Sequence, residues 1–180
     1  MLCLLALSVG LAGCSQHVAP TGHQAPPFQV TATIQELMDS EIDPAADALW
    51  DSVGSVSTLS GTEDRQPRTE EEWKAVRRQA ITLVEATNLL VMEGRPVAPK
   101  DAPAAADGEL APAEMQRRIE STRPSFVGFA QSLRLAGLKA LAAIDAKDPQ
   151  RLMDAGGTID EACEACHVTY WYPNQKVPTT

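Results

Sequence analysis

The sequence predicts an all-α protein, an antiparallel four-helix bundle, from three observations. Alanine and leucine dominate a composition that is 44% hydrophobic but only 4% aromatic, and both residues favour helix. Apolar residues recur at three- and four-residue intervals in four long segments, and no segment shows the alternation of a half-buried strand. The 180 residues suit one domain with a sizeable core, and mostly modest connections between long helices favour a bundle.

The first helical segment covers residues 31–53, and Pro44 interrupts it. Either the helix kinks at Pro44, or Asp43 caps a second segment in which Pro44 takes the first position. The polar residues 55–68 contain Gly61 and are expected to form a loop. The apolar face of the first segment comprises Ile34, Leu37, Met38, Ile42, Ala45, Ala46, Leu49 and Val53.

The second helix begins at Thr69, which forms a capping-box pattern with Glu72. Gly94 and Pro96 end it, and the Ala/Pro-rich residues 95–112 are predicted to form an exposed crossover loop. Its buried stripe comprises Trp73, Val76, Ala80, Leu83, Val84, Thr87, Leu90 and Val91.

The third pattern covers residues 112–146 and breaks at Pro124. Asp148 is the predicted N-cap of the fourth helix, with Pro149 at its first position and its end near Pro173. The apolar face after the break comprises Phe126, Phe129, Leu133, Gly137, Ala140, Leu141 and Ile144. The fourth helix presents Leu152, Ala155, Gly156, Ile159, Cys163, Cys166 and His167.

The N-terminus is predicted to be a targeting segment. Residues 1–13 carry no charge and are too short to span a bilayer, which takes about 20 apolar residues. They lead into Cys14 through Leu11-Ala12-Gly13, and Leu11-Ala12-Gly13-Cys14 resembles the lipobox of bacterial lipoproteins, where cleavage precedes a cysteine that receives lipid. The segment lacks the Lys or Arg with which signal peptides normally open. An ordinary secretory peptide or a short core segment remains the alternative.

Four regions therefore follow one another: a signal peptide (1–13), a lipidated N-terminus and flexible tether (14–30), the helical domain (31–173) and a C-terminal tail (174–180). We expect the domain to face the periplasm, anchored to a bacterial membrane through Cys14. Ser15, by resemblance to sorted lipoproteins, favours the outer membrane.

Once Cys3 leaves with the signal and Cys14 takes lipid, only Cys163 and Cys166 remain, and His167 follows at once. This C-x-x-C-H sequence is the pattern of c-type haem attachment. On a helix, positions i, i+3 and i+4 share a face. Two thiols can then add to two vinyl groups of one porphyrin, and the histidine can reach the iron as proximal ligand.

Two other interpretations of the cysteine pair stay open. A thioredoxin-type redox pair expects a βαβ setting, and the sequence predicts no strands. A zinc site needs about four N/S ligands, whereas the folded domain offers three. His17 or His23 could complete such a site, but both lie on the tether.

The helix order, the motif on the last helix and Tyr170 after it resemble the class II cytochromes c, the cytochrome c′ and cytochrome c556 family, over residues 31–173. The resemblance implies one covalent haem c in the bundle core, and a chain that in this family often packs as a homodimer. Cys163 and Cys166 would form the thioethers and His167 the proximal bond. In this family the first helix lines the distal face. Members with methionine there tend to be six-coordinate electron carriers, and members with an aliphatic residue tend to be five-coordinate and bind small gases.

Met38 lies on the apolar stripe of the first helix, so the resemblance implies a thioether as sixth iron ligand. The alternative is a flexible core filler, the usual role of a buried methionine. Met92, Met115 and Met153 are weaker candidates.

The sequence departs from the family pattern at one aromatic residue near its C-terminus. Trp171 stands four residues after the haem histidine, where cytochromes c′ usually carry Arg or Lys, and this weakens the gas-binding interpretation. This aromatic cluster could shield the haem rim or serve as a docking surface, or Tyr170 and Trp171 could simply close the end of the bundle. Trp50 and Trp73 are expected in the core.

Composition narrows the function. The net charge of −9 argues against nucleic acid and fits a redox partner with a basic docking patch. The three histidines leave no obvious general base, so we expect no enzyme. The leading hypothesis is a membrane-tethered electron carrier. The alternatives are a five-coordinate haem protein that binds NO or CO and a structural lipoprotein without haem, and Met38→Leu should change the visible spectrum only of the electron carrier.

Overall fold

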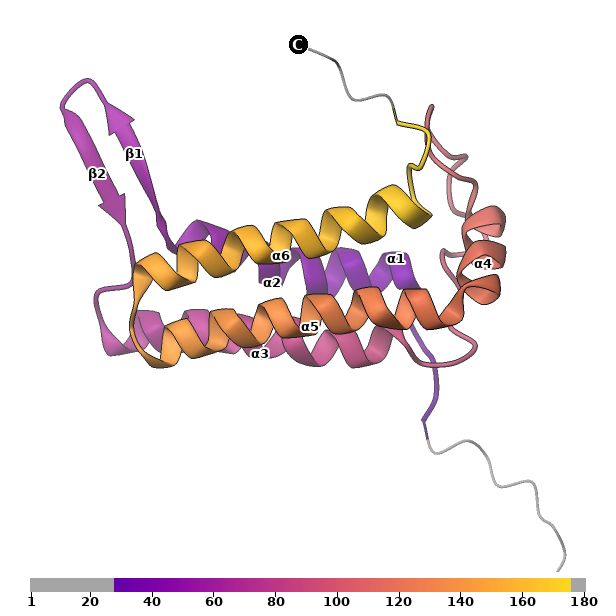
Figure 1. Ribbon diagram of the computed structural model, residues 1–180, viewed down its shortest axis with the longest axis horizontal. Coiled ribbons are helices and arrows are strands. Elements are labelled where there is room, and N and C mark those ends of the chain that lie inside the picture. The colour runs from indigo at the N-terminus through magenta and orange to yellow at the C-terminus, as the bar shows by residue number, and fades with distance from the viewer. Residues whose placement is uncertain (1–27, 176–180) are drawn as a thin grey trace, which may run out of the picture.

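The structure, a computed structural model, describes residues 28–175 and is mostly helical, with 64% of these residues in helices (Figure 1). The expected signal peptide, the lipidated Cys14, most of the tether with His17 and His23, and the last residues of the tail lie outside the described residues.

The first helical segment consists of three consecutive elements: α1 (Ile34–Leu37), the π-helical turn η1 (Met38–Ile42) and α2 (Asp43–Ser52). Asp43 does not cap α2 with its side chain. Its backbone N–H instead donates to the Met38 carbonyl five residues earlier. Because Pro44 has no N–H and its ring would clash with a carbonyl four residues back, a widened turn admits it without ending the helical path.

A two-stranded hairpin replaces most of the predicted loop after α2. Strand β1 (Gly54–Thr58) pairs antiparallel with β2 (Gly61–Arg65), with Gly54 opposite Arg65, and the hairpin projects from one end of the helices (Figure 1). The expectation that the chain contains no strand was wrong here. Neither face of the hairpin is buried. Its strands therefore need no apolar face, and their sequence shows no alternation of apolar and polar residues.

The remaining helices begin where the capping residues predict. Thr69 and Glu72 form the expected capping box at the start of α3 (Glu70–Leu90). The break at Pro124 separates α4 (Pro112–Ser121) from α5 (Arg123–Asp145). The Asp148 side chain accepts the Arg151 N–H at the start of α6 (Pro149–Tyr170), which confirms the predicted N-cap.

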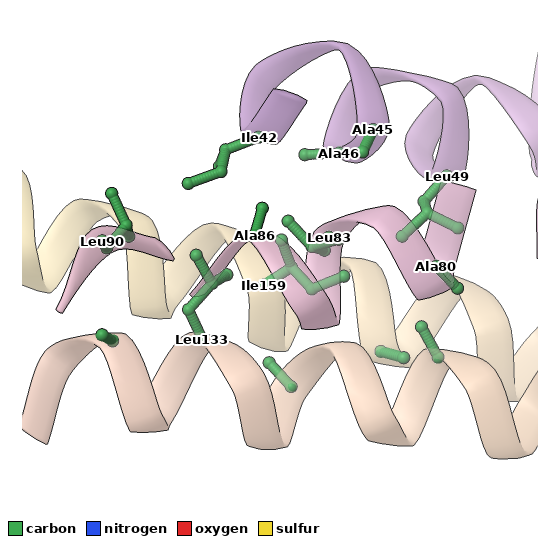
Figure 2. Close-up of a cluster of buried hydrophobic side chains, with 14 of the residues drawn as sticks. Ile42, Ala45, Ala46, Leu49, Ala80, Leu83, Ala86, Leu90, Leu133 and Ile159 are labelled. Atoms are coloured by element: carbon green, nitrogen blue, oxygen red, sulfur yellow. The ribbon is translucent and has the colours of Figure 1, made fainter. Parts of the chain in front are cut away.

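The four longer helical stretches enclose one apolar core. Helix α5 packs against α3 and α6, α2 packs against the same two helices, and α4 crosses the end of α5 and α6 (Figure 1). By length and composition α5 could also cross a membrane, but its buried face belongs to this core. Figure 2 shows side chains from the facing helices that meet there, including Ile42, Leu49, Leu83, Leu133 and Ile159.

The connection from α3 to α4 (residues 91–111, the α3–α4 connection) is not simply exposed as predicted. Arg95, Val97 and Leu110 are buried within it. The carbonyls of Pro96 and Val97 accept the first amides of α1, and the Leu110 N–H donates to the Trp171 carbonyl at 2.7 Å. The connection is therefore fastened at both ends, across the end of the molecule where α1 begins and α6 ends.

Candidate functional site

A cavity opens at that end of the molecule. The start of the first helical segment, the α3–α4 connection, α4 and the last turns of α6 form its walls. Its volume is about 250 Å³, and the empty space including its open mouth is about 1070 Å³. Apolar side chains form most of the lining, and Met38, Cys166 and His167 are among the lining residues. The structure thus brings a residue of the first segment together with two residues of the motif.

The three motif residues lie in the last two turns of α6 and are partly buried. Cys163 and Cys166 pack against the core cluster and are not bonded to one another. The helix ends just beyond His167, whose carbonyl accepts the N–H groups of Trp171 and Tyr172 at 2.8 and 3.1 Å. The end of α6 therefore places the histidine at the cavity wall, while Cys163 stands one turn earlier on the same helix.

Both motif thiols are held in the protonated form. Burial, reinforced by Asp43 and Asp160, raises the pKa of Cys163 to about 11. Burial, reinforced by Cys163, raises the pKa of Cys166 to about 12. Disulfide oxidoreductases depend on a cysteine whose pKa is lowered, so that a thiolate attacks. This pair has the opposite electrostatics, which disfavours the redox-pair interpretation.

His167 has the properties of a metal ligand. Burial lowers the pKa of its imidazole, while the negative charges of Asp43 and Glu164 oppose that shift. The neutral ring keeps a lone pair available for iron. Asp43, which lines the cavity mouth, was not identified from the sequence as a site residue.

Two aromatic side chains stand against the imidazole. The Trp171 ring meets His167 edge-on, with centroids 5.2 Å apart, and the Tyr172 ring lies 5.9 Å away. The Tyr172 hydroxyl donates to Glu164 at 2.5 Å. Trp171 therefore covers one edge of the histidine, and the same side chain remains 40% exposed to solvent.

Tyr170 differs from its neighbour in being buried. Its ring meets Phe126 and Phe129 edge-on, and its hydroxyl shares a hydrogen bond with Thr122 at 2.8 Å. These contacts with the start of α5 close the end of the helices. Tyr170 therefore closes the end of the helices, whereas Trp171 stands beside His167 and reaches solvent.

The three methionines that were weaker ligand candidates lie in different parts of the fold. Met115 of α4 lines the same cavity as Met38. Met92 accepts a hydrogen bond from the buried Arg95, and Met153 lies exposed on α6. Met115 is thus the one of the three weaker candidates that the fold brings to the site.

Trp73 is buried as expected, and Trp50 is half-buried. The Trp50 indole donates from Nε1 to the Gly156 carbonyl at 3.0 Å, and a Cβ on Gly156 would lie 3.0 Å from Trp50 Cδ1. The tryptophan therefore packs closely on the backbone of α6, two turns before Cys163.

The donor set and the walls fit a c-type haem. Imidazole and thioether groups, which His167 and Met38 bring to the cavity, are among the side chains that can ligate haem iron, and mostly apolar walls suit a porphyrin. Within residues 28–175, no group of three or more His, Cys, Asp or Glu side chains is arranged to hold a metal ion by itself. Comparisons with protein-family models, with curated proteins and with solved structures found no match for the chain.

Proposed function

We propose that the chain is a monohaem c-type cytochrome, an antiparallel four-helix bundle that carries electrons. One observation supports this most: Met38 and His167, which lie far apart in the sequence, line a single, mostly apolar cavity together with Cys166. The class II cytochromes c, which the motif resembles, are the family whose arrangement matches these roles.

The motif residues would hold the haem covalently. Cys163 and Cys166 would each form a thioether by addition of the thiol S–H across a vinyl group of the haem, an addition that would consume no oxidant. The protonated state of Cys163 and Cys166 is compatible with this addition and protects the pair from disulfide chemistry before attachment. His167, whose imidazole burial favours in the neutral form, would supply a ring nitrogen to the iron.

Haem supplies a one-electron cycle between ferric and ferrous iron. A thioether ligand favours ferrous haem iron, so Met38 in that role would raise the reduction potential. The apolar walls limit water at the cavity, and Tyr170 seals its inner end through Phe126 and Phe129. These residues would hold the iron in one coordination state through the cycle, as an electron carrier requires.

The segment before the domain would set its location. We propose that residues 1–13 direct export, that lipid on Cys14 anchors the chain to a bacterial membrane, and that the tether lets the domain reorient in the periplasm. The acidic domain would exchange electrons with proteins that present a basic patch.

Covalent attachment is tested by producing the chain in a host that attaches haem c and staining a denaturing gel for haem peroxidase activity. Colour that stays with the chain, and is lost in the double variant Cys163→Ala, Cys166→Ala, is the expected result. A chain that carries no colour despite active attachment machinery would overturn the proposal and return the structural lipoprotein as the best interpretation.

A further inference from the structure

The net charge of the protein resides on two neighbouring helical segments. The run from Ile34 to Ser52 and helix α6 together carry ten of the 24 acidic residues and one of the 15 basic residues, Arg151. The rest of the chain therefore carries fourteen of each sign and is neutral overall. Because α2 packs against α6, the excess charge of −9 is concentrated on one side of the fold.

The carboxylates of these two segments gather around the attachment motif. Asp43 and Asp160 act electrostatically on Cys163, and Asp43 and Glu164 act on His167. Asp39 and Asp47 lie near enough to Asp43 to repel it. Among the described residues, these five carboxylates form no salt bridge, whereas α3 and α5 hold ion pairs such as Arg77–Asp145.

The outer face of α6 also exposes apolar side chains within this charged field. Met153 and Val168 are each 43% exposed, and Trp171 continues the same face beyond the end of the helix. Exposed Asp160 and Glu164 stand between them at helical spacing. Val168 and Trp171, three residues apart, therefore form a small apolar patch bordered by like charges, and aromatic residues are enriched in protein contact surfaces.

We propose that this α2–α6 face, centred on Trp171 and Val168 and bordered by Asp39, Asp47, Asp160 and Glu164, docks a protein whose own contact surface is rich in Lys and Arg. The proposal rests on the proposed function, since the same face holds the edge of the haem motif and would bring a redox partner to it. Trp171 would lie in the contact, with its ring against His167.

The negative charge of the α2–α6 face favours a basic protein over the other classes of partner. A second copy would bring an equally acidic face to the first, and the two would repel. Nucleic acids and anionic lipid surfaces are also negatively charged, so the acidic face would repel them. A basic partner gains from electrostatic steering, which speeds association and weakens with salt.

The test measures binding of the purified, haem-loaded protein to mitochondrial cytochrome c, a lysine-rich protein used as a probe, by biolayer interferometry at low and at 0.5 M salt. The variant Asp39→Asn, Asp47→Asn, Asp160→Asn removes three charges from the face. The matched control Glu71→Gln, Glu85→Gln, Glu93→Gln removes three exposed charges from α3 and the turn after it. Lysine-acetylated cytochrome c serves as the uncharged probe.

We expect the α2–α6 variant to weaken binding by roughly 3- to 125-fold, since each of the three exposed ion pairs contributes a factor of roughly 1.4 to 5. The α3 control variant should change binding less than twofold. High salt, or acetylation of the lysines of the probe, should abolish binding of the unmodified protein. Amide signals of Val168 and Trp171 should shift in NMR titrations while those of α3 stay in place. Equal losses in the two variants, or shifts spread over α3, would overturn the proposal.

Binding does not require iron redox chemistry, so the two proposals fail separately. A protein without haem that still binds the probe through this face would retain the docking surface and lose the electron-carrier proposal. A haem-loaded protein that binds no basic probe, with circular dichroism showing a folded chain, would lose the docking surface alone.

Discussion

Substitution of Gly137 by alanine tests how closely α3 and α5 approach. A Cβ at this position would lie 2.8 Å from Val84 Cγ2 and 3.7 Å from Leu83 Cδ2. Both neighbours are buried, and a valine in a helix is held in one rotamer, so its methyl group has no free direction. Alanine gains about 1 kcal/mol of helix propensity, and overpacking costs about 1–3 kcal/mol. We expect a net loss of between about 0 and 2 kcal/mol.

The assay is urea unfolding followed by circular dichroism. Gly128→Ala on the same helix is the matched control, because a Cβ there meets nothing within 4 Å. It should stabilise the protein by up to about 1 kcal/mol. In a Val84→Ala background the close contact is gone, and Gly137→Ala should then stabilise as well. A Gly137→Ala protein as stable as Gly128→Ala in the native background would refute the close approach.

Three further outcomes follow from the caps and the thiols. Thr69→Ala should cost about 1 kcal/mol in the same unfolding assay, and no loss would contradict its capping role. Hydrogen bonds from the Arg68 and Thr69 amides lower the pKa of Glu72, so its stabilisation is present above the usual pKa of 4.5 and lost as the pH falls through the folded value. Unfolding curves of wild type should therefore weaken more between pH 5 and 3 than those of Glu72→Gln, and parallel curves would count against this. In protein made without haem, iodoacetamide should alkylate Cys163 at pH 8 roughly a hundredfold more slowly than a thiol with a pKa of 9, because about a hundredfold less thiolate is present. Rapid alkylation would restore the redox-pair interpretation.

Capping residues made most helix boundaries predictable. Thr69 with Glu72 and Asp148 with Pro149 mark starts that depend on local hydrogen bonds alone, so the sequence contains the whole signal. The apolar stripes likewise predicted the buried residues, because one face of each helix meets the core. Alanine at the centres of these stripes leaves room for close helix packing.

Features set by tertiary contacts or by exposed backbone escaped prediction. The hairpin from Gly54 to Arg65 has no buried face and therefore no pattern. The π-turn at Met38–Ile42 resolves a conflict between Pro44 and a continuous helix, and a sequence shows the conflict but not its resolution. The α3–α4 connection looked exposed because Ala and Pro carry no periodicity, although Val97 and Leu110 anchor it.

The candidate site was predictable in part. Spacing placed Cys163, Cys166 and His167 on one helix, and the family resemblance selected Met38, which lines the same cavity as Cys166 and His167. Asp43 escaped notice as a site residue because a lone carboxylate carries no motif, and Met115 was predicted only as one of three weaker ligand candidates. Their place at the cavity follows from how the first segment and α4 meet α6.

The most direct test of the proposed function is the visible absorption spectrum of the haem-loaded protein, oxidised and reduced, with and without carbon monoxide. We predict a low-spin reduced spectrum that carbon monoxide leaves unchanged, because the Met38 thioether holds the sixth position. Met38→Leu should convert it to a high-spin spectrum that shifts with carbon monoxide. A native protein that already binds carbon monoxide would contradict the electron-carrier account and favour the gas-binding one, and a spectrum without haem bands would contradict both.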